Sequence, residues 1–359
     1  MIIVTMNTHK TSVGALKSPQ SAKVLTPPIT PTLLSTEAHQ LFEELRIIHQ
    51  RLSECESLSP GELVNGLLTG LVKLCIEPYS TEFATHFLNI EGIGTLCSSL
   101  QSICAHAEGQ LEEYWAVRIL ETQNADSMCT MKIARIVRRA EINCIAVSNL
   151  STHRVLHRFP YYTNYIDLSR LESNLLSAFL PSPQATTTNI AFIGSGPLPL
   201  SSICLLDNMP KAKIVNIDRD AQALGLSKKL VEYLCIPPDR MSFILEDVEE
   251  SLATNGSPHP TRDAIAWNSL DVVFLAALVG MGSAAKVPIL ASLARRLKPG
   301  ALILARSARG LRTVLYPVSR RKRLFTHDDN GEDDANSVCA CLGSGAGRGY
   351  FKVWVRRAR

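Results

Sequence analysis

The spacing of apolar residues predicts helices in the first half of the chain. From Thr36 onward, apolar residues recur at intervals of three and four, which places them on one face of a helix. Those residues are Leu41, Leu45, Ile48 and Leu52. Ser59 and Pro60 then predict the start of a second helix, with Ser59 as its N-cap. Another helical run covers 93–120, so we expect a small helical bundle within 36–180.

Beyond Pro160 the pattern changes to short apolar runs that alternate with helical stretches. The runs predict buried strands at 189–194, 213–218, 241–245, 270–275 and 301–305. Helical patterns lie between them at 199–208, 221–234 and 284–297. Strands that alternate with helices are typical of parallel sheets. The expected fold class is therefore α/β, a Rossmann-like doubly wound parallel sheet over 181–338 with an N-terminal helical bundle domain.

Three segments depart from this two-domain pattern. A Ser-, Thr- and Pro-rich leader over 1–35 is expected to be disordered, and a basic insert covers about 127–157. An atypical tail over 339–359 contains a glycine-rich stretch, 343–349, that we interpret as flexible. If the sheet ends before this tail, it exposes an unpaired edge and loses stability.

Composition excludes several classes of protein. With 46% hydrophobic and 19% charged residues, the 359-residue chain is not wholly disordered. No apolar run approaches the roughly 20 residues of a membrane span, and no secretory signal is visible, so we expect a cytoplasmic protein. The net charge of +4 comes from basic residues in the atypical segments, and we expect neither a nucleic-acid nor a membrane partner. Ten scattered cysteines without a C-x-x-C pair predict no metal site.

The first predicted strand runs into a glycine-rich turn, Gly194-Ser195-Gly196. Two glycines allow a sharp turn and the close approach of a ligand to the start of the next helix. The third glycine of a dinucleotide fingerprint would fall at 199, where this chain has Pro199. The turn therefore favours a ligand without a pyrophosphate, such as S-adenosylmethionine.

Two acids follow neighbouring strands of the predicted sheet. Asp218 ends the second strand, where an acid accepts hydrogen bonds from ribose hydroxyls. Asp247 follows the third strand and is placed to meet the adenine amino group. The alternative is a structural turn beside two solvated acids.

Four longer segments resemble motifs of one enzyme family, the nicotianamine synthases, and stand in that family's order. They are 159–172, 192–200, 271–281 and 306–317, with a weaker resemblance over 36–120. The resemblance implies an enzyme that joins three S-adenosylmethionine molecules into nicotianamine and releases three methylthioadenosines. It implies no cofactor beyond S-adenosylmethionine, which is the substrate. It also adds Leu275 and Ala276 to the residues expected to bind this molecule.

The resemblance further implies a catalytic glutamate in the helical domain and a tyrosine after the Phe-Pro-Tyr-Tyr motif. These carry over to Glu112 and Tyr165, with Glu113 as the alternative if the alignment shifts by one residue. The reaction needs the α-amine of one substrate molecule deprotonated beside the γ-carbon of another, and a base and an orienting hydroxyl serve that need. Tyr162 is expected to contact the substrate, with packing in the core as its alternative.

Two other functions remain open from the residues alone. One is an S-adenosylmethionine-dependent methyltransferase on the same fold. The other is a non-catalytic ligand-binding homologue, which the atypical insert and tail favour.

Overall fold

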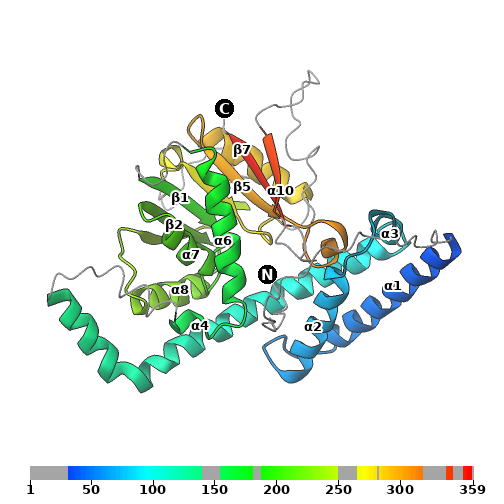
Figure 1. The fold of residues 1–359 in the computed structure, drawn as a ribbon, viewed down its shortest axis with the longest axis horizontal. Helices are drawn as coiled ribbons and strands as arrows, with labels where there is room; N and C mark the ends of the chain where they lie inside the picture. The colour runs from blue at the N-terminus through cyan, green and yellow to red at the C-terminus, as the bar shows by residue number, and fades with distance from the viewer. Residues whose placement is uncertain are drawn as a thin grey trace, which may run out of the picture.

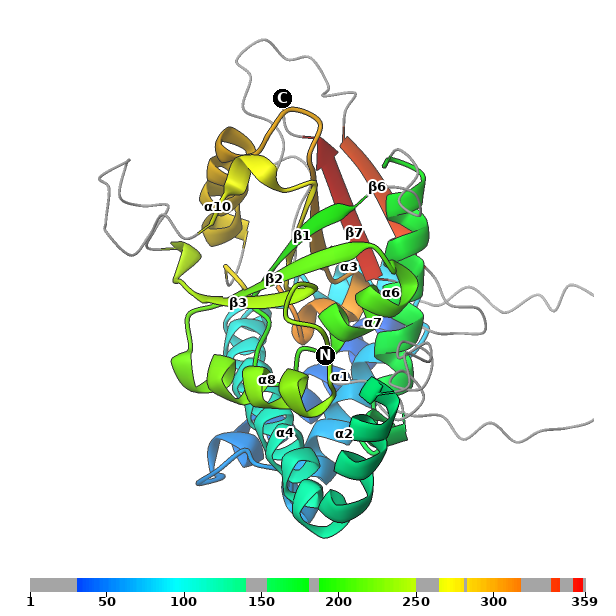
Figure 2. The ribbon, with the colours of Figure 1, turned by 90° about the vertical axis from the view of Figure 1, so that its left-hand side faces the viewer.

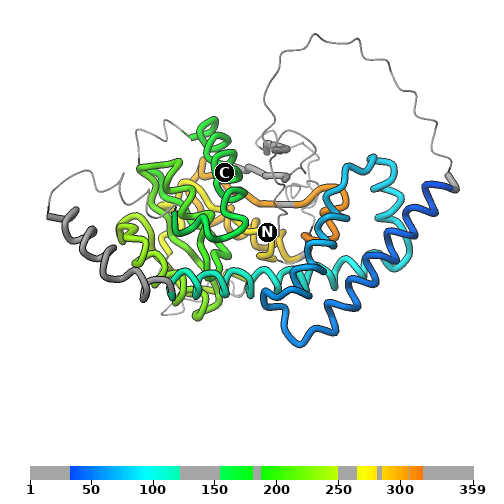
Figure 3. The backbone as a smooth tube through the Cα atoms, turned by 60° about the horizontal axis from the view of Figure 1, so that its bottom comes forward, coloured from blue at the N-terminus to red at the C-terminus, as the bar shows by residue number. Residues whose placement is uncertain are grey.

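The computed structural model describes residues 31–139, 154–180, 187–249, 265–280, 283–317, 337–342 and 351–357. A helical region and an α/β region lie side by side, and one long helix, α4, connects them (Figure 1). The helices of the first region are α1 (Pro31–Ser53), α2 (Glu62–Ile76), α3 (Thr81–Phe87) and α4 (Ile93–Arg139). The tube in Figure 3 shows α4 extending from this bundle to the α/β region, where it packs on α8 (Ala221–Tyr233).

Two helix starts differ from the sequence-based prediction. Helix α1 begins at Pro31, inside the segment expected to be a disordered leader. Helix α2 begins at Glu62 with Gly61 as its N-cap, so the prediction of Ser59 as N-cap is wrong. The Ser59 hydroxyl instead donates to the Oε1 atom of Gln110 at 3.2 Å, which ties this loop to α4.

Helix α4 also runs further than expected, because it continues past residue 120 to Arg139 and so enters the basic insert. Residues 140–153 of that insert lie outside the described residues, as do 1–30 of the predicted leader.

Seven strands form one sheet in the order β3-β2-β1-β4-β5-β7-β6. The first five are parallel, which confirms the predicted fold class. They are β1 (Thr188–Ile193), β2 (Ala212–Asp218), β3 (Met241–Leu245), β4 (Val272–Leu275) and β5 (Leu302–Ser307). The strand order reverses between β1 and β4, and the crevice at such a reversal is where open α/β sheets bind ligands.

The tail completes the sheet. Strands β6 (Ser337–Leu342) and β7 (Phe351–Arg357) form an antiparallel pair, and β7 pairs antiparallel with β5. The sheet therefore does not end before the atypical tail over 339–359, and β5 is not the exposed edge that such an ending would leave. The stretch 343–349, interpreted as flexible, lies outside the described residues.

Helices cover both faces of the sheet (Figure 2). On one face lie α6 (Tyr162–Ser177), α7 (Leu200–Asn208) and α8, and on the other lies α10 (Ser283–Arg296). Strand β1 is apolar on both faces, as such burial requires. Ile190 and Phe192 point to the core under α6, α7 and α8, whereas Ala191 and Ile193 point to the core under α10. The short helices η1 (Trp267–Ser269) and η2 (Gly310–Val314) complete the described elements.

The core of the helical bundle and the cores of the sheet do not separate at the predicted domain boundary near residue 180. Helix α6, placed by prediction in the helical domain, packs on α7 and the sheet. Conversely, Leu311, Val314 and Tyr316 of the predicted sheet domain belong to the core of the helical bundle. The segment after β5 therefore joins the two regions, and the cavity described next lies where they meet.

Candidate active site

The glycine turn after β1 has a backbone that other residues adopt only with strain. Gly194 and Gly196 have φ angles of +79° and +66°. A Cβ atom on Gly194 would lie 2.5 Å from Val279 Cγ2, and one on Gly196 would lie 2.5 Å from Oε2 of Glu112. Both conformation and close packing thus require glycine, and the second contact brings α4 directly against the turn.

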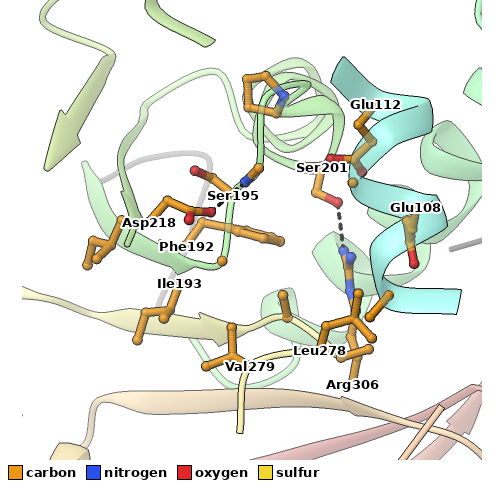
Figure 4. Close-up of a pocket in the computed structure, with 18 of the residues that line it drawn as sticks. Glu108, Glu112, Phe192, Ile193, Ser195, Ser201, Asp218, Leu278, Val279 and Arg306 are labelled. Carbon is orange, nitrogen blue, oxygen red and sulfur yellow. Dashed lines mark hydrogen bonds between the residues drawn. The ribbon is translucent and has the colours of Figure 1, made fainter. Parts of the chain in front are cut away.

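A cavity of about 440 Å³ opens beside this turn, at the carboxyl ends of the parallel strands (Figure 4). That volume lies in the range of small-molecule sites. The walls come from α4, the β1–α7 turn, the ends of β2 and β3, the loop after β4 and the segment from β5 to η2. Predicted site residues that line it are Glu112, Tyr165, Gly194, Ser195, Gly196, Asp218, Asp247 and Ala276.

Glu112 of α4 and Tyr165 of α6 lie next to each other in the wall of this cavity. The Tyr165 hydroxyl donates to Oε1 of Glu112 at 3.3 Å. Burial raises the pKa of Glu112 to about 7, while the Tyr165 hydrogen bond and the Arg306 charge pull that pKa down and Asp218 pushes it up. Burial, reinforced by the Glu112 charge, raises the pKa of Tyr165 well above its ordinary value, so this hydroxyl keeps its proton. A carboxyl group with a pKa near neutrality is suited to proton transfer.

The neighbouring acid, Glu113, points elsewhere. Its Oε1 atom accepts a hydrogen bond of 2.8 Å from Gln222 on α8, and it does not line the cavity. Adjacent helical residues differ by about 100° in direction. Of the two alternatives, the structure therefore places Glu112 in the cavity.

Asp218 and Asp247 lie at the ends of β2 and β3, as expected for parallel strands. The Gly196 amide donates to Oδ2 of Asp218 at 2.8 Å, which fixes the acid against the glycine turn. Asp247 accepts the Glu249 amide at 2.9 Å and lies 3.9 Å from the Arg219 guanidinium. Both carboxylates reach the cavity.

Ser195 also lines the cavity, with its side chain buried. Its hydroxyl has no hydrogen-bond partner among the described residues.

Two predicted site residues lie outside the cavity. Tyr162 is 1% exposed; its ring packs edge-on against His157 and its hydroxyl hydrogen-bonds to Cys204. Leu275 is 1% exposed and points into the core beneath α10, while the next residue, Ala276, lines the cavity. The expected substrate contact of Tyr162 and ligand contact of the Leu275 side chain are corrected to packing in the core.

Arg306, which the sequence did not single out, lines the same cavity from β5. Its guanidinium contacts both oxygens of the buried Glu172, at 2.8 and 2.9 Å, and lies 5.4 Å from the centre of the Phe192 ring. The available signal was an arginine directly after the apolar run 301–305, at the start of the motif 306–317. Its partner lies 134 residues earlier in the chain, which no local pattern reveals.

Lys286 is a second buried charge that sequence reasoning missed. It is 1% exposed, and its Nζ atom donates to the Ala277 carbonyl at 2.6 Å. Glu249 accepts the Gly280 amide at 3.0 Å. The two side chains hold both ends of the loop that follows β4 and lines the cavity.

Fold and cavity together define a Rossmann-like protein whose site at the strand reversal suits a ligand with a nucleoside part. The family model described as nicotianamine synthase protein matches residues 35–130 and 129–329, and the chain belongs to that family. This confirms the family that the four motifs predicted, and with it the prediction of a transferase that uses S-adenosylmethionine.

Curated relatives agree with this membership. The chain is 32% identical to nicotianamine synthase 2 of Arabidopsis thaliana over 289 residues, which covers 79% of this chain and 76% of the relative. It is 34% identical to nicotianamine synthase of Solanum lycopersicum over 291 residues, which covers 80% and 76%.

Among solved structures, MtNAS in complex with MTA and tNA has a TM-score of 0.59 and 18% identity, covering 89% of this chain and 98% of that one. A glutamate-to-glutamine mutant of MtNAS in complex with S-adenosylmethionine has a TM-score of 0.60, with the same identity and coverage. At this level of identity the likeness shows the fold.

Among the described residues, no helix has the length and apolar character that a membrane crossing requires. The described part of the chain also contains no group of three or more His, Cys, Asp or Glu residues arranged to hold a metal ion.

Proposed function

We propose that this chain synthesises nicotianamine from three S-adenosylmethionine molecules by transfer of 3-amino-3-carboxypropyl groups. The observation that carries the proposal is the Glu112–Tyr165 pair, 3.3 Å apart, in a cavity that also contains the glycine turn and Asp218. A methyltransferase needs only to present a methyl group. A half-buried acid with a pKa near 7 suits a reaction that must remove a proton from an amine.

Each transfer makes one C–N bond and breaks one C–S bond. The α-amine of one molecule attacks the γ-carbon of another, and the sulfur leaves with its electron pair as methylthioadenosine. The amine must lose a proton, and the Glu112 carboxylate receives it. Tyr165 donates to the same carboxylate and so keeps one of its oxygens oriented. In the last transfer the attacking amine belongs to the same molecule as the γ-carbon, and the attack closes a four-membered ring.

The walls of the cavity support roles in holding the substrate. Asp218, fixed by the Gly196 amide, would accept hydrogen bonds from the ribose hydroxyls. Asp247 would meet the adenine amino group, and Ala276 and the glycine turn would pack against the nucleoside. The sulfonium is already a good leaving group, so the proposed reaction needs no further cofactor. A cytoplasmic location and a role in metal homeostasis, through a chelating product, belong to the same proposal.

Mass spectrometry of the products tests this function directly. Purified protein incubated with S-adenosylmethionine should yield methylthioadenosine and nicotianamine. Adenosylhomocysteine together with a methylated acceptor would instead indicate a methyltransferase, and unchanged substrate would indicate a non-catalytic homologue. Glu112→Gln should remove both products, whereas the matched control Glu113→Gln, whose carboxylate points to α8, should retain them.

A further inference from the structure

The Arg306 guanidinium is placed where a substrate carboxylate would be recognised. Its side chain is 10% exposed and borders the cavity that Glu112 and Tyr165 share (Figure 4). The positive charge is close enough to Glu112 to lower the pKa of that carboxyl group.

The protein satisfies only part of this side chain. An arginine has five N–H donors. The Nε atom and Nη2 donate to the two carboxylate oxygens of Glu172, and Nη2 also donates to the Ser201 hydroxyl at 3.1 Å. These three bonds hold the guanidinium plane in one orientation. Among the described residues, the two donors on Nη1 have no partner.

The first turn of α7 borders the same part of the cavity. Ser201 and Ser202 line it, and this nine-residue helix begins at Leu200, with Pro199 as its N-cap and no side-chain hydrogen bond to the cap. The first amides of a helix point outward and carry partial positive charge, which favours an anion. Arg306 and the start of α7 thus present donors to one part of the cavity, next to Glu112, whereas the opposite side carries the acids Asp218 and Asp247.

We propose that Arg306 binds the α-carboxylate of the aminocarboxypropyl group whose α-amine faces Glu112. The inference rests on the proposed function. Amine and carboxylate are attached to one carbon atom, so a cation and an acid on one cavity wall match the two ends of an amino-acid head group. Arginine suits this task because its planar fork orients a carboxylate, whereas a lysine ammonium acts as a point charge. Arg306 is accordingly a specificity-determining residue that also directs the amine toward its base.

A substrate without the carboxylate tests this role. Decarboxylated S-adenosylmethionine keeps the nucleoside, sulfonium and amine, and differs only in the group that Arg306 is proposed to bind. Calorimetric dissociation constants for both ligands should be measured in a Glu112→Gln background, so that neither ligand is consumed. Loss of charge-assisted hydrogen bonds weakens binding by roughly tenfold to a hundredfold. We expect S-adenosylmethionine to bind tighter by that factor.

The preference should disappear when Arg306 is replaced together with its partner, so that no charge stays buried alone. The double variant Arg306→Gln/Glu172→Gln should bind both ligands within about twofold, or favour the more cationic decarboxylated form because of the acidic walls. Arg306→Lys, which keeps the charge without the fork, should show a reduced preference and decides the matter if the double variant does not fold. Arg170→Gln, at an exposed arginine of α6, is the matched control and should keep the full preference.

A full preference in the double variant or in Arg306→Lys would overturn the inference, as would equal binding of both ligands by the parent protein. A purely structural role of Arg306 predicts that both ligands weaken equally. The dissociation constants are measured without turnover. Failure of nicotianamine synthesis would therefore contradict the proposed function, but it would not change the measured preference for the carboxylate.

Discussion

The two sides of the cavity differ in how far their charged side chains are exposed to water. On the side of α4, α6 and β5, Arg306 and Glu172 are buried and bonded to each other, and the half-buried Glu112 is bonded to the buried Tyr165. On the side of β2 and β3, Asp247 and Arg219 keep side-chain exposures of 28% and 71%. Burial changes proton affinity and strengthens electrostatic contacts, whereas exposure weakens them. The buried side is therefore suited to proton transfer, and the open side to holding the nucleoside.

The largest effect is expected on the buried side. Glu112→Gln keeps the shape of the side chain but removes its ability to accept a proton, and should lower kcat by roughly 10²–10⁴-fold. The rate of methylthioadenosine release measures this. A variant that keeps more than about a tenth of the rate would remove Glu112 from the role of base.

The same substitution should stabilise the fold at neutral pH. Because the pKa of Glu112 is raised from 4.5 to about 7, the folded protein binds this proton more tightly than the unfolded chain. Stability is then highest below pH 4.5 and falls as pH rises toward 7, by about 3 kcal/mol for this group. Glutamine does not titrate, so the free energy of unfolding of Glu112→Gln relative to the parent should rise between pH 5 and pH 8. If urea denaturation gives the same difference in free energy of unfolding between variant and parent at both pH values, the raised pKa of Glu112 is contradicted.

A smaller effect is expected where the two sides meet, at the glycine turn. Gly196→Ala places a Cβ in the left-handed region and 2.5 Å from Oε2 of Glu112, at a cost of roughly 1–2 kcal/mol for the backbone alone. Thermal unfolding should show the loss of stability, and activity should fall because the base is displaced. Gly225→Ala in α8, where the new Cβ meets nothing within 4 Å apart from its chain neighbours and the local helix backbone, is the control and should be neutral or slightly stabilising.

The smallest effect is expected on the open side. Asp247→Asn removes a partly exposed charge 3.9 Å from Arg219, and exposed pairs of this kind contribute little. We expect KM for S-adenosylmethionine to rise by roughly two- to tenfold with kcat nearly unchanged, the result of losing ground-state binding. A fall in kcat as large as that of Glu112→Gln would remove the distinction between the two sides.

The parallel core of the fold was predictable because its strands are short apolar runs bounded by helical patterns. Strands β6 and β7 were missed, since they come from a C-terminal segment with no family motif and pair antiparallel on β5. The candidate site was predictable where one motif places a residue, as with Gly196 and Asp218. It was not predictable where the outcome depends on three-dimensional packing. Tyr162 and Tyr165 lie one turn apart on α6, yet only Tyr165 reaches the cavity.

The pH dependence of kcat/KM in the parent protein and in Tyr165→Phe tests the central claim, that Glu112 accepts the proton of the attacking amine. This parameter reports groups of the free enzyme and the free substrate, and the substrate is the same in both profiles. The parent protein should show a limb that rises toward a pKa of about 7. The hydrogen bond from Tyr165 lowers the pKa of Glu112. The Tyr165→Phe variant lacks this bond, so its limb should move to higher pH. Identical profiles in the two proteins would contradict the account.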